Sequence, residues 1–265
     1  MSTTTLCQAF TGFVVKAFVI TEFELRKLRH DYTELITRAL QPALWLLIFG
    51  PVFARTGAMH TGALPYLDFI APGILAQSVL FVAIFYGINV IWERDLGIVQ
   101  KFLVSPTPRA ALVLGKGFAA GIRSLSQGIV VYILSLLIGV KLNLHPLALL
   151  NVFIIVIVAS TLFSTFSLIV ACIVKTRERF MGVGQVLTMP MFFASNAIYP
   201  IDLMPHWLKI VAYLNPLTYV VDALRACMLA NDASAFGLMN DYCVIFLTTA
   251  LLVYVGAHLY PRLAT

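Results

Sequence analysis

The segment Trp92–Arg109, WERDLGIVQKFLVSPTPR, decides the fold because it separates two long apolar runs with charges and prolines. Glu93, Arg94 and Asp95 directly follow an apolar run, at the point where a membrane helix would emerge into water. The pattern predicts a short amphipathic helix over Gly97–Val104, which the following Ser-Pro-Thr-Pro ends because proline lacks an N–H and disfavours a helical residue before it. The apolar side of this helix would consist of Leu96, Val99, Phe102 and Leu103.

Two interpretations of this segment remain on physical grounds. A rigid surface helix between two spans can transmit force to a soluble partner, whereas an ordinary loop would only fix the topology through its charges.

The composition places the chain in the membrane. Of its 265 residues, 60% are hydrophobic and 11% are charged, whereas a soluble domain carries roughly 25% charged residues. The net charge of +6 does not indicate nucleic-acid binding, because the basic residues lie in short segments between apolar runs. We therefore expect an all-α polytopic membrane protein with no nucleic-acid partner.

The apolar runs predict six transmembrane helices in a single domain over 1–265. They cover about 35–53, 69–92, 110–140, 147–174, 180–197 and 242–260. Residues 16–32 predict an interfacial amphipathic helix, with Glu22 and Arg26 paired at i,i+4. Residues 200–230 predict two short apolar helices that dip partway into the outer side of the membrane. Lysine and arginine gather on one side, which predicts that both termini are cytoplasmic.

The third span carries two cations, Lys116 and Arg123, which are seven residues apart and share a face. We expect them to mark its inner, water-accessible part. Gly115-Lys116-Gly117 resembles a phosphate-binding loop only superficially, because the required earlier glycine is absent and no Ser or Thr follows the lysine. The sequence predicts no nucleotide site, no metal site and no catalytic residues in this chain. A Cys227–Cys243 bridge stays open.

Several motifs together resemble one family. The inner segment carries Glu93, Arg94, Gly97, Lys101, Leu103, Ser105 and Pro106, followed by Leu114-Gly-Lys116. Later come Tyr199-Pro200-Ile-x-x-Met204-Pro205-x-Trp207-Leu208, then Asn215-Pro216-Leu-Thr-Tyr219 and Asp222-x-x-Arg225. In this order, over nearly the whole chain, they resemble the permease subunit of type-2 ABC (ATP-binding cassette) exporters, which include daunorubicin-resistance-like permeases and polysaccharide permeases.

The resemblance implies partners and site residues. Residues 92–109 would be a coupling segment that docks on a separate ATPase, present in two copies, which alone would bind ATP and Mg²⁺. The implied docking residues are Glu22, Arg26, Arg29, Glu93, Arg94, Asp95, Gly97, Lys101, Leu103, Ser105 and Pro106. Two copies of the permease would pair as a homodimer in the lipid of the plasma membrane and move substrate by alternating access.

The resemblance also implies a substrate path and an outer gate. The path would run between the second and fifth spans, lined by Phe81, Phe85, Asn89, Met189, Phe192, Phe193 and Asn196. The outer gate would be formed by the re-entrant helices, with Pro200, Pro205, Trp207, Asn215, Pro216 and Tyr219.

The expected function is ATP-driven export of a hydrophobic drug-like or lipid substrate, in which this chain is not itself an enzyme. One alternative is a permease for a lipid-linked polysaccharide or glycolipid. Another is a secondary transporter driven by an ion gradient, which would favour membrane-buried carboxylates and an internal repeat. The sequence shows no internal repeat, and the carboxylates closest to the apolar runs all fall near predicted span ends. An intramembrane enzyme would need a convergent catalytic set, and the five histidines are dispersed.

Overall fold

The computed structural model describes residues 3–28, 32–57, 64–105, 107–174, 176–230 and 234–263, and each regular element in these ranges is a helix. The first part of the chain contains α1 (Thr3–Leu28), α2 (Tyr32–Leu44), the π-helix η1 (Trp45–Phe49), α3 (Gly50–Thr56), α4 (Tyr66–Asp95) and α5 (Ile98–Val104). The second part contains α6 (Arg109–Leu137), α7 (Pro146–Ile173), α8 (Arg177–Phe193), η2 (Ile201–Leu203), α9 (His206–Leu214), α10 (Pro216–Met228), α11 (Leu238–Leu259) and η3 (Tyr260–Leu263).

Five helical stretches of the described chain are long and apolar enough to cross a membrane. They are Thr37–Thr56, Tyr66–Asp95, Arg109–Leu137, Pro146–Ile173 and Leu238–Leu263. The prediction of an all-α polytopic membrane protein is confirmed, but the count of six spans is not. The predicted fifth span corresponds to α8, whose 17 residues extend about 25 Å at 1.5 Å per residue, less than the roughly 30 Å of a bilayer core.

Helix α4 forms the centre of the bundle, because it is apolar on nearly every side and packs against α6, α7, α8 and α10. Small residues let its neighbours approach closely. A Cβ at Gly87 would lie 2.0 Å from Ser167 Oγ, and that hydroxyl donates a hydrogen bond to the carbonyl oxygen of Ile84. A Cβ at Gly73 would lie 2.1 Å from the carbonyl oxygen of Ala197. The backbone of α4 is therefore in direct contact with α7 and with the segment after α8.

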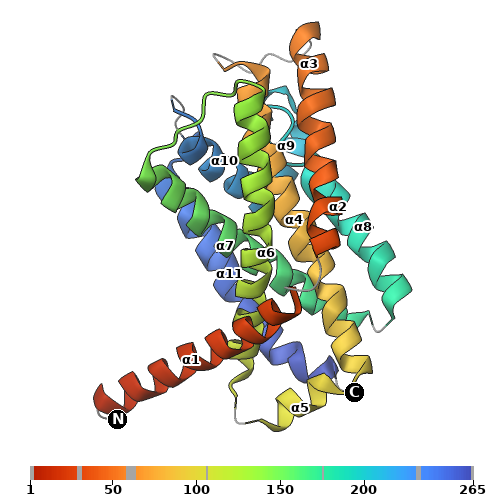
Figure 1. Cartoon of the computed structure of the whole chain (residues 1–265), viewed down its shortest axis with the longest axis vertical. Coiled ribbons are helices and arrows are strands. Elements are labelled where there is room, and N and C mark those ends of the chain that lie inside the picture. Colours follow the sequence, from red (N-terminus) through yellow and green to blue (C-terminus); the bar gives the residue numbers. More distant parts are fainter. Residues whose placement is uncertain are drawn as a thin grey trace.

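The bundle has two distinct ends (Figure 1). Helix α5 and the end of α11 lie at one, here called the α5 end, and η3 packs there in the same apolar cluster as Val99 of α5. Helices α9 and α10 lie toward the other, here called the α9 end. Helix α1 leans away from the bundle and meets it near the α5 end. The predicted interfacial helix thus begins at Thr3 rather than at residue 16, and residues 29–31 lie outside the described chain.

Candidate functional site

The turn between α4 and α5 depends on Gly97. Its φ of +71° lies in the left-handed region, where a side chain is unfavourable, and this conformation redirects the chain from the long span into the short helix. At the other end of α5, Ser105 Oγ donates a hydrogen bond of 2.7 Å to the carbonyl oxygen of Phe102. Ser105 itself is extended, as expected for a residue before proline, and Pro106 lies outside the described residues. The predicted short helix is present with both of its limits explained.

One face of α5 packs on the bundle and the other is open. Val99 is fully buried, and Phe102 and Leu103 are half-buried beside it. In contrast, Val104 is 87% exposed and Leu96 is 68% exposed. Leu96 was expected on the packed side, but it precedes the Gly97 turn and therefore lies outside the helical periodicity of α5. With the exposed Lys101, these two residues give the α5 end an apolar surface outside the membrane spans, here called the α5 surface.

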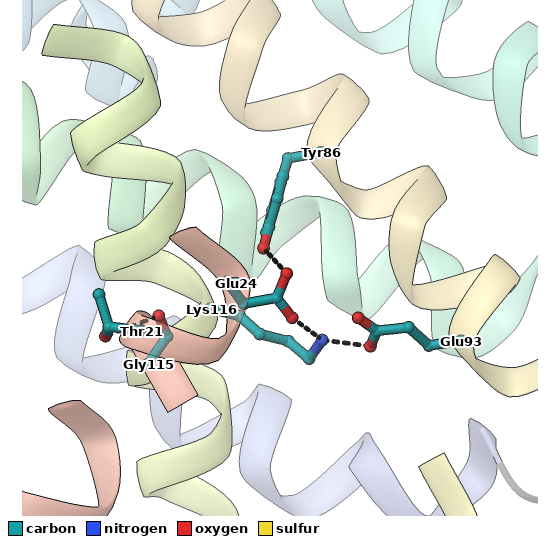
Figure 2. Close-up of polar contacts among 6 residues, drawn as sticks. All are labelled: Thr21, Glu24, Tyr86, Glu93, Gly115 and Lys116. Carbon is teal, nitrogen blue, oxygen red and sulfur yellow. Dashed lines mark hydrogen bonds and ion pairs between the residues drawn. The ribbon is translucent and has the colours of Figure 1, made fainter. Parts of the chain in front are cut away.

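A buried cluster of charges, drawn in Figure 2, lies next to α5, where the ammonium of Lys116 is 6.0 Å from the ring centroid of Phe102. The ammonium of Lys116 on α6 is 3.0 Å from Glu24 Oε1 on α1 and also pairs with Glu93 Oε2 on α4. Tyr86 of α4 donates a hydrogen bond of 2.6 Å to Glu24 Oε2. Glu24, Glu93 and Lys116 are only 1–3% exposed. These four residues, here called the Lys116 cluster, join three helices through contacts with little access to water.

This cluster changes the interpretation of three residues. Glu93 was expected on the ATPase-docking surface, but its carboxylate is directed inward to Lys116. Lys116 and Arg123 were expected to mark a water-accessible part of the third span, and this prediction is wrong, because they are 3% and 8% exposed. Arg123 lies over the ring of Tyr86, with its guanidinium carbon 5.0 Å from the ring centroid. Both cations face neighbouring helices rather than solvent.

Close packing of α1 on α6 positions Glu24. A Cβ at Gly115 would lie 2.6 Å from Ile20 Cβ and 2.8 Å from the carbonyl oxygen of Ala17, so a larger residue would push α1 away. Thr21 Oγ1 lies 3.1 Å from the carbonyl oxygen of Gly115 and is its hydrogen-bond donor. Phe23 of α1 then meets Phe102 of α5 edge-on, with ring centroids 5.9 Å apart. The cluster and these contacts link α5 mechanically to α1, α4 and α6.

The remaining docking candidates lie at or near the surface of the α5 end. Glu22 and Arg26 form an exposed i,i+4 pair at 2.7 Å, as predicted. Asp95 pairs with Arg94 and, at 2.7 Å, with Arg177 at the start of α8, whose guanidinium carbon lies 3.8 Å from the ring centroid of Trp92. Arg177 was not among the docking residues that the sequence predicted. Arg29 lies outside the described residues.

A pocket of about 340 Å³ lies among α2, α4, α6 and α8, here called the α2–α4 pocket. Its polar lining comes from Arg38, Gln41, Ser78 and Gln127. Its apolar lining comes from Pro42, Phe81, Val82, Phe85, Ile88 and Met181. The rings of Phe81 and Phe85 are 6.1 Å apart and form one apolar wall. The volume falls within the range of sites for small ligands.

The pocket contains only part of the predicted substrate path. Phe81 and Phe85 line it, whereas Phe192 is fully buried against Trp45, with ring centroids 6.0 Å apart. The other path candidates that are not among its lining residues are Asn89, Met189, Phe193 and Asn196. Sequence reasoning missed Arg38, Gln41 and Gln127. A polar residue in an apolar span was the available signal, but the sequence did not show that these three face the same space.

At the α9 end, Asn215 connects α8 to α10. Its Nδ2 donates to the carbonyl oxygen of Met191 at 2.6 Å, and its Oδ1 accepts from Leu217 N at 3.0 Å, which caps α10. Tyr219 donates to the carbonyl oxygen of Tyr213 at 2.9 Å. Among the other gate candidates, Trp207 and Pro205 are exposed and Pro200 and Pro216 are half-buried. Asn215, Pro216 and Tyr219 therefore meet at one junction, while Trp207 lies on the open side of α9.

Two further expectations concern metals and cysteines. Within the described ranges, no group of three or more His, Cys, Asp or Glu side chains is placed to hold a metal ion. Cys227 is buried and Cys243 is exposed, and both are free thiols, so the bridge that the sequence left open is not formed.

Comparison with known proteins identifies the family. The model of the ABC-2 type transporter family matches residues 15–229. A putative transport permease, ycf38, of Cyanophora paradoxa is 28% identical over 215 residues, which are 80% of this chain and 74% of the relative. The daunorubicin resistance ABC transporter permease protein DrrB1 of Streptomyces coeruleorubidus is 25% identical over 235 residues, covering 89% of this chain and 81% of the relative. The probable multidrug ABC transporter permease YbhR of Escherichia coli (strain K12) is 29% identical over 192 residues, 71% of this chain and 50% of the relative. The chain is therefore a member of the ABC-2 type transporter family.

Proposed function

We propose that this chain is the transmembrane subunit of an ATP-driven exporter in the plasma membrane. Its cargo would be a hydrophobic drug-like molecule or a lipid, and a separate cassette ATPase would supply the energy. The α5 end would be cytoplasmic, with both termini on that side. Two permease copies and two ATPase copies would form the working unit, and ATP and Mg²⁺ would bind to the ATPase.

The observation that carries this proposal is the two-sided character of α5. The exposed Leu96 and Val104 lie outside the membrane spans, where an apolar surface suits a soluble protein partner. The opposite face of α5 is packed through Val99 and Phe102 onto helices that the Lys116 cluster joins. A push on the α5 surface would therefore be transmitted to α1, α4 and α6 rather than absorbed by a loose loop.

Alternating access would then use the two ends of the bundle in turn. The α2–α4 pocket lies beside the central helix, and the Asn215 junction lies at the α9 end. ATP binding by the partner would shift the balance between two conformations only if cargo binds them with different affinities. A lipid-linked glycan remains the alternative cargo within this class, because the polar half of the pocket also suits hydroxyl groups.

The test uses the full chain co-expressed with a candidate cassette ATPase subunit. Lys101→Glu and Val104→Asp alter the α5 surface without touching the Lys116 cluster, and we expect each to reduce co-purification of the ATPase and its stimulation by the permease. Lys209→Glu, on α9 at the other end, is the matched control and should change neither. Glu93 is unsuitable for this test because it is buried. Normal co-purification and normal coupled ATPase activity in both α5 variants would refute the assignment.

A further inference from the structure

The α2–α4 pocket contains one cation, the guanidinium of Arg38, near one end of a candidate span. Arg38 is in the candidate span Thr37–Thr56, and its side chain lines the pocket beside α4. The α4 residues that line the pocket run from Ser78 to Ile88, which places them about 10–25 Å from the end of α4 at Asp95, at 1.5 Å per residue. An arginine near the end of a span commonly extends toward the headgroups, but this one also lines a pocket between helices.

The lining is divided into a polar part and an apolar part. Gln41 and Gln127 lie with Arg38 on the polar side, and Phe81 and Phe85 form the apolar wall. A ligand that satisfies both sides must have a polar head and an apolar body. The pocket volume of about 340 Å³ is suited to a single-tailed or drug-sized molecule rather than to a whole two-tailed phospholipid.

The charge of the pocket selects the head group. Among the described residues that line it, Arg38 is the one ionisable side chain, and a guanidinium stays protonated in proteins. A cationic ligand would bring a second positive charge beside this guanidinium, whereas a carboxylate, phosphate or sulfate would be attracted to it. The guanidinium has five N–H donors, enough to keep contacts within the chain and also make a two-pronged bond to an anion.

From these observations we propose that the cargo is an anionic amphiphile, with its acidic head at Arg38 and its apolar body against Phe81 and Phe85. The proposal rests on the proposed export function in calling the ligand a cargo. The preference for an anion itself depends only on the pocket.

The test measures binding without the ATPase. The full chain is placed in nanodiscs of neutral phosphatidylcholine and labelled with two photoreactive probes of equal chain length, a diazirine-bearing palmitic acid and a diazirine-bearing hexadecylamine. The labelled positions are then mapped by mass spectrometry. We expect the acid to label the α4 segment around Phe81 and Phe85 about tenfold more than the amine, as a charge-assisted hydrogen bond allows.

Variants assign the preference to Arg38. Arg38→Gln should lower labelling by the acid about tenfold, and Arg38→Lys should retain part of it because the charge remains. Arg55→Gln is the matched control, because Arg55 is an exposed arginine at the other end of the same span. If Arg38→Gln fails to fold, the comparison of the two probes on the native chain still tests whether the pocket prefers an anion. Equal labelling by the two probes, preference for the amine, or unchanged labelling in a folded Arg38→Gln would each overturn the proposal.

Two further measurements distinguish a bound cargo from a resident lipid and separate the ligand class from the export function. Adding phosphatidylglycerol to the nanodiscs should leave labelling by the acid unchanged. Displacement of the acid by this lipid would overturn the proposal in favour of a resident membrane lipid. Coupled ATPase activity is measured on the same preparations. A preference for the acid without coupled ATPase activity would refute the export function and leave the ligand class standing. Coupled ATPase activity without this preference would support the export function and refute the anionic ligand.

Discussion

The substitution Lys116→Met tests whether the Lys116 cluster holds the α5 end together. Methionine keeps the length and apolar stem of the side chain but removes the ammonium that Glu24 and Glu93 share. Both carboxylates would stay in place, 1% and 3% exposed, without this cation between them. Breaking a buried ion pair on one side costs about 3–5 kcal/mol, much of it because a charge is left uncompensated. We therefore expect the free energy of unfolding to fall by about 4 kcal/mol.

Two companion variants identify the source of this loss. Glu93→Gln alone should cost only about 1–2 kcal/mol, because the amide oxygen can still accept a hydrogen bond and Lys116 keeps Glu24 as its partner. In the double variant Glu93→Gln with Lys116→Met, one of the two carboxylates that lost the ammonium is gone as well. The double variant should therefore be more stable than Lys116→Met alone, which is a non-additivity that a simple loss of packing would not produce.

The measurement is the unfolding of the full chain by SDS in mixed micelles, followed by circular dichroism and tryptophan fluorescence. Arg177→Gln serves as the control, because it breaks the pair between Arg177 and Asp95. Each of these two side chains is more than one-third exposed. Pairs of this kind contribute about 0–1 kcal/mol. If Lys116→Met costs no more than Arg177→Gln, the cluster does not stabilise the α5 end, and the mechanical link proposed for α5 loses its main support.

Two other substitutions test the turn before α5 and the junction near α9. Gly97→Ala should lower the unfolding free energy by about 1–2 kcal/mol, because alanine is strained at a φ of +71°. The control is Gly182→Ala, which should not lower it, because nothing lies within 4 Å of the added Cβ. Equal effects of the two substitutions would contradict the strain argument. Asn215→Leu should cost about 1–3 kcal/mol by removing the α10 cap and the hydrogen bond to Met191, whereas the exposed Asn240→Leu should cost clearly less, which thermal unfolding of the two variants would check.

The position of α5 could be predicted from sequence because its signals are local. The charges of Glu93–Asp95 end an apolar run, Gly97 permits a sharp turn, and the proline after Ser105 stops the helix. The two short helices within residues 200–230 were predicted from the sequence as well, and the structure separates them at Asn215. The count of six spans was less secure, because α8 combines glycines and a proline with an apolar composition and stays short of a bilayer's thickness.

The partners of the charged residues were decided by tertiary structure. Lys116 lies 92 residues from Glu24 and 23 from Glu93, so no helical spacing relates them. Their meeting depends on how far each helix is rotated about its axis, and that rotation depends on close approaches such as Gly115 against Ile20. The same holds for Arg38, because only the packing of α2 beside α4, α6 and α8 brings it to the α2–α4 pocket. Composition and periodicity thus determined which segments are helical and apolar, because these depend on neighbours along the chain. Which polar side chains face one another was determined only by the packing of helices distant in sequence.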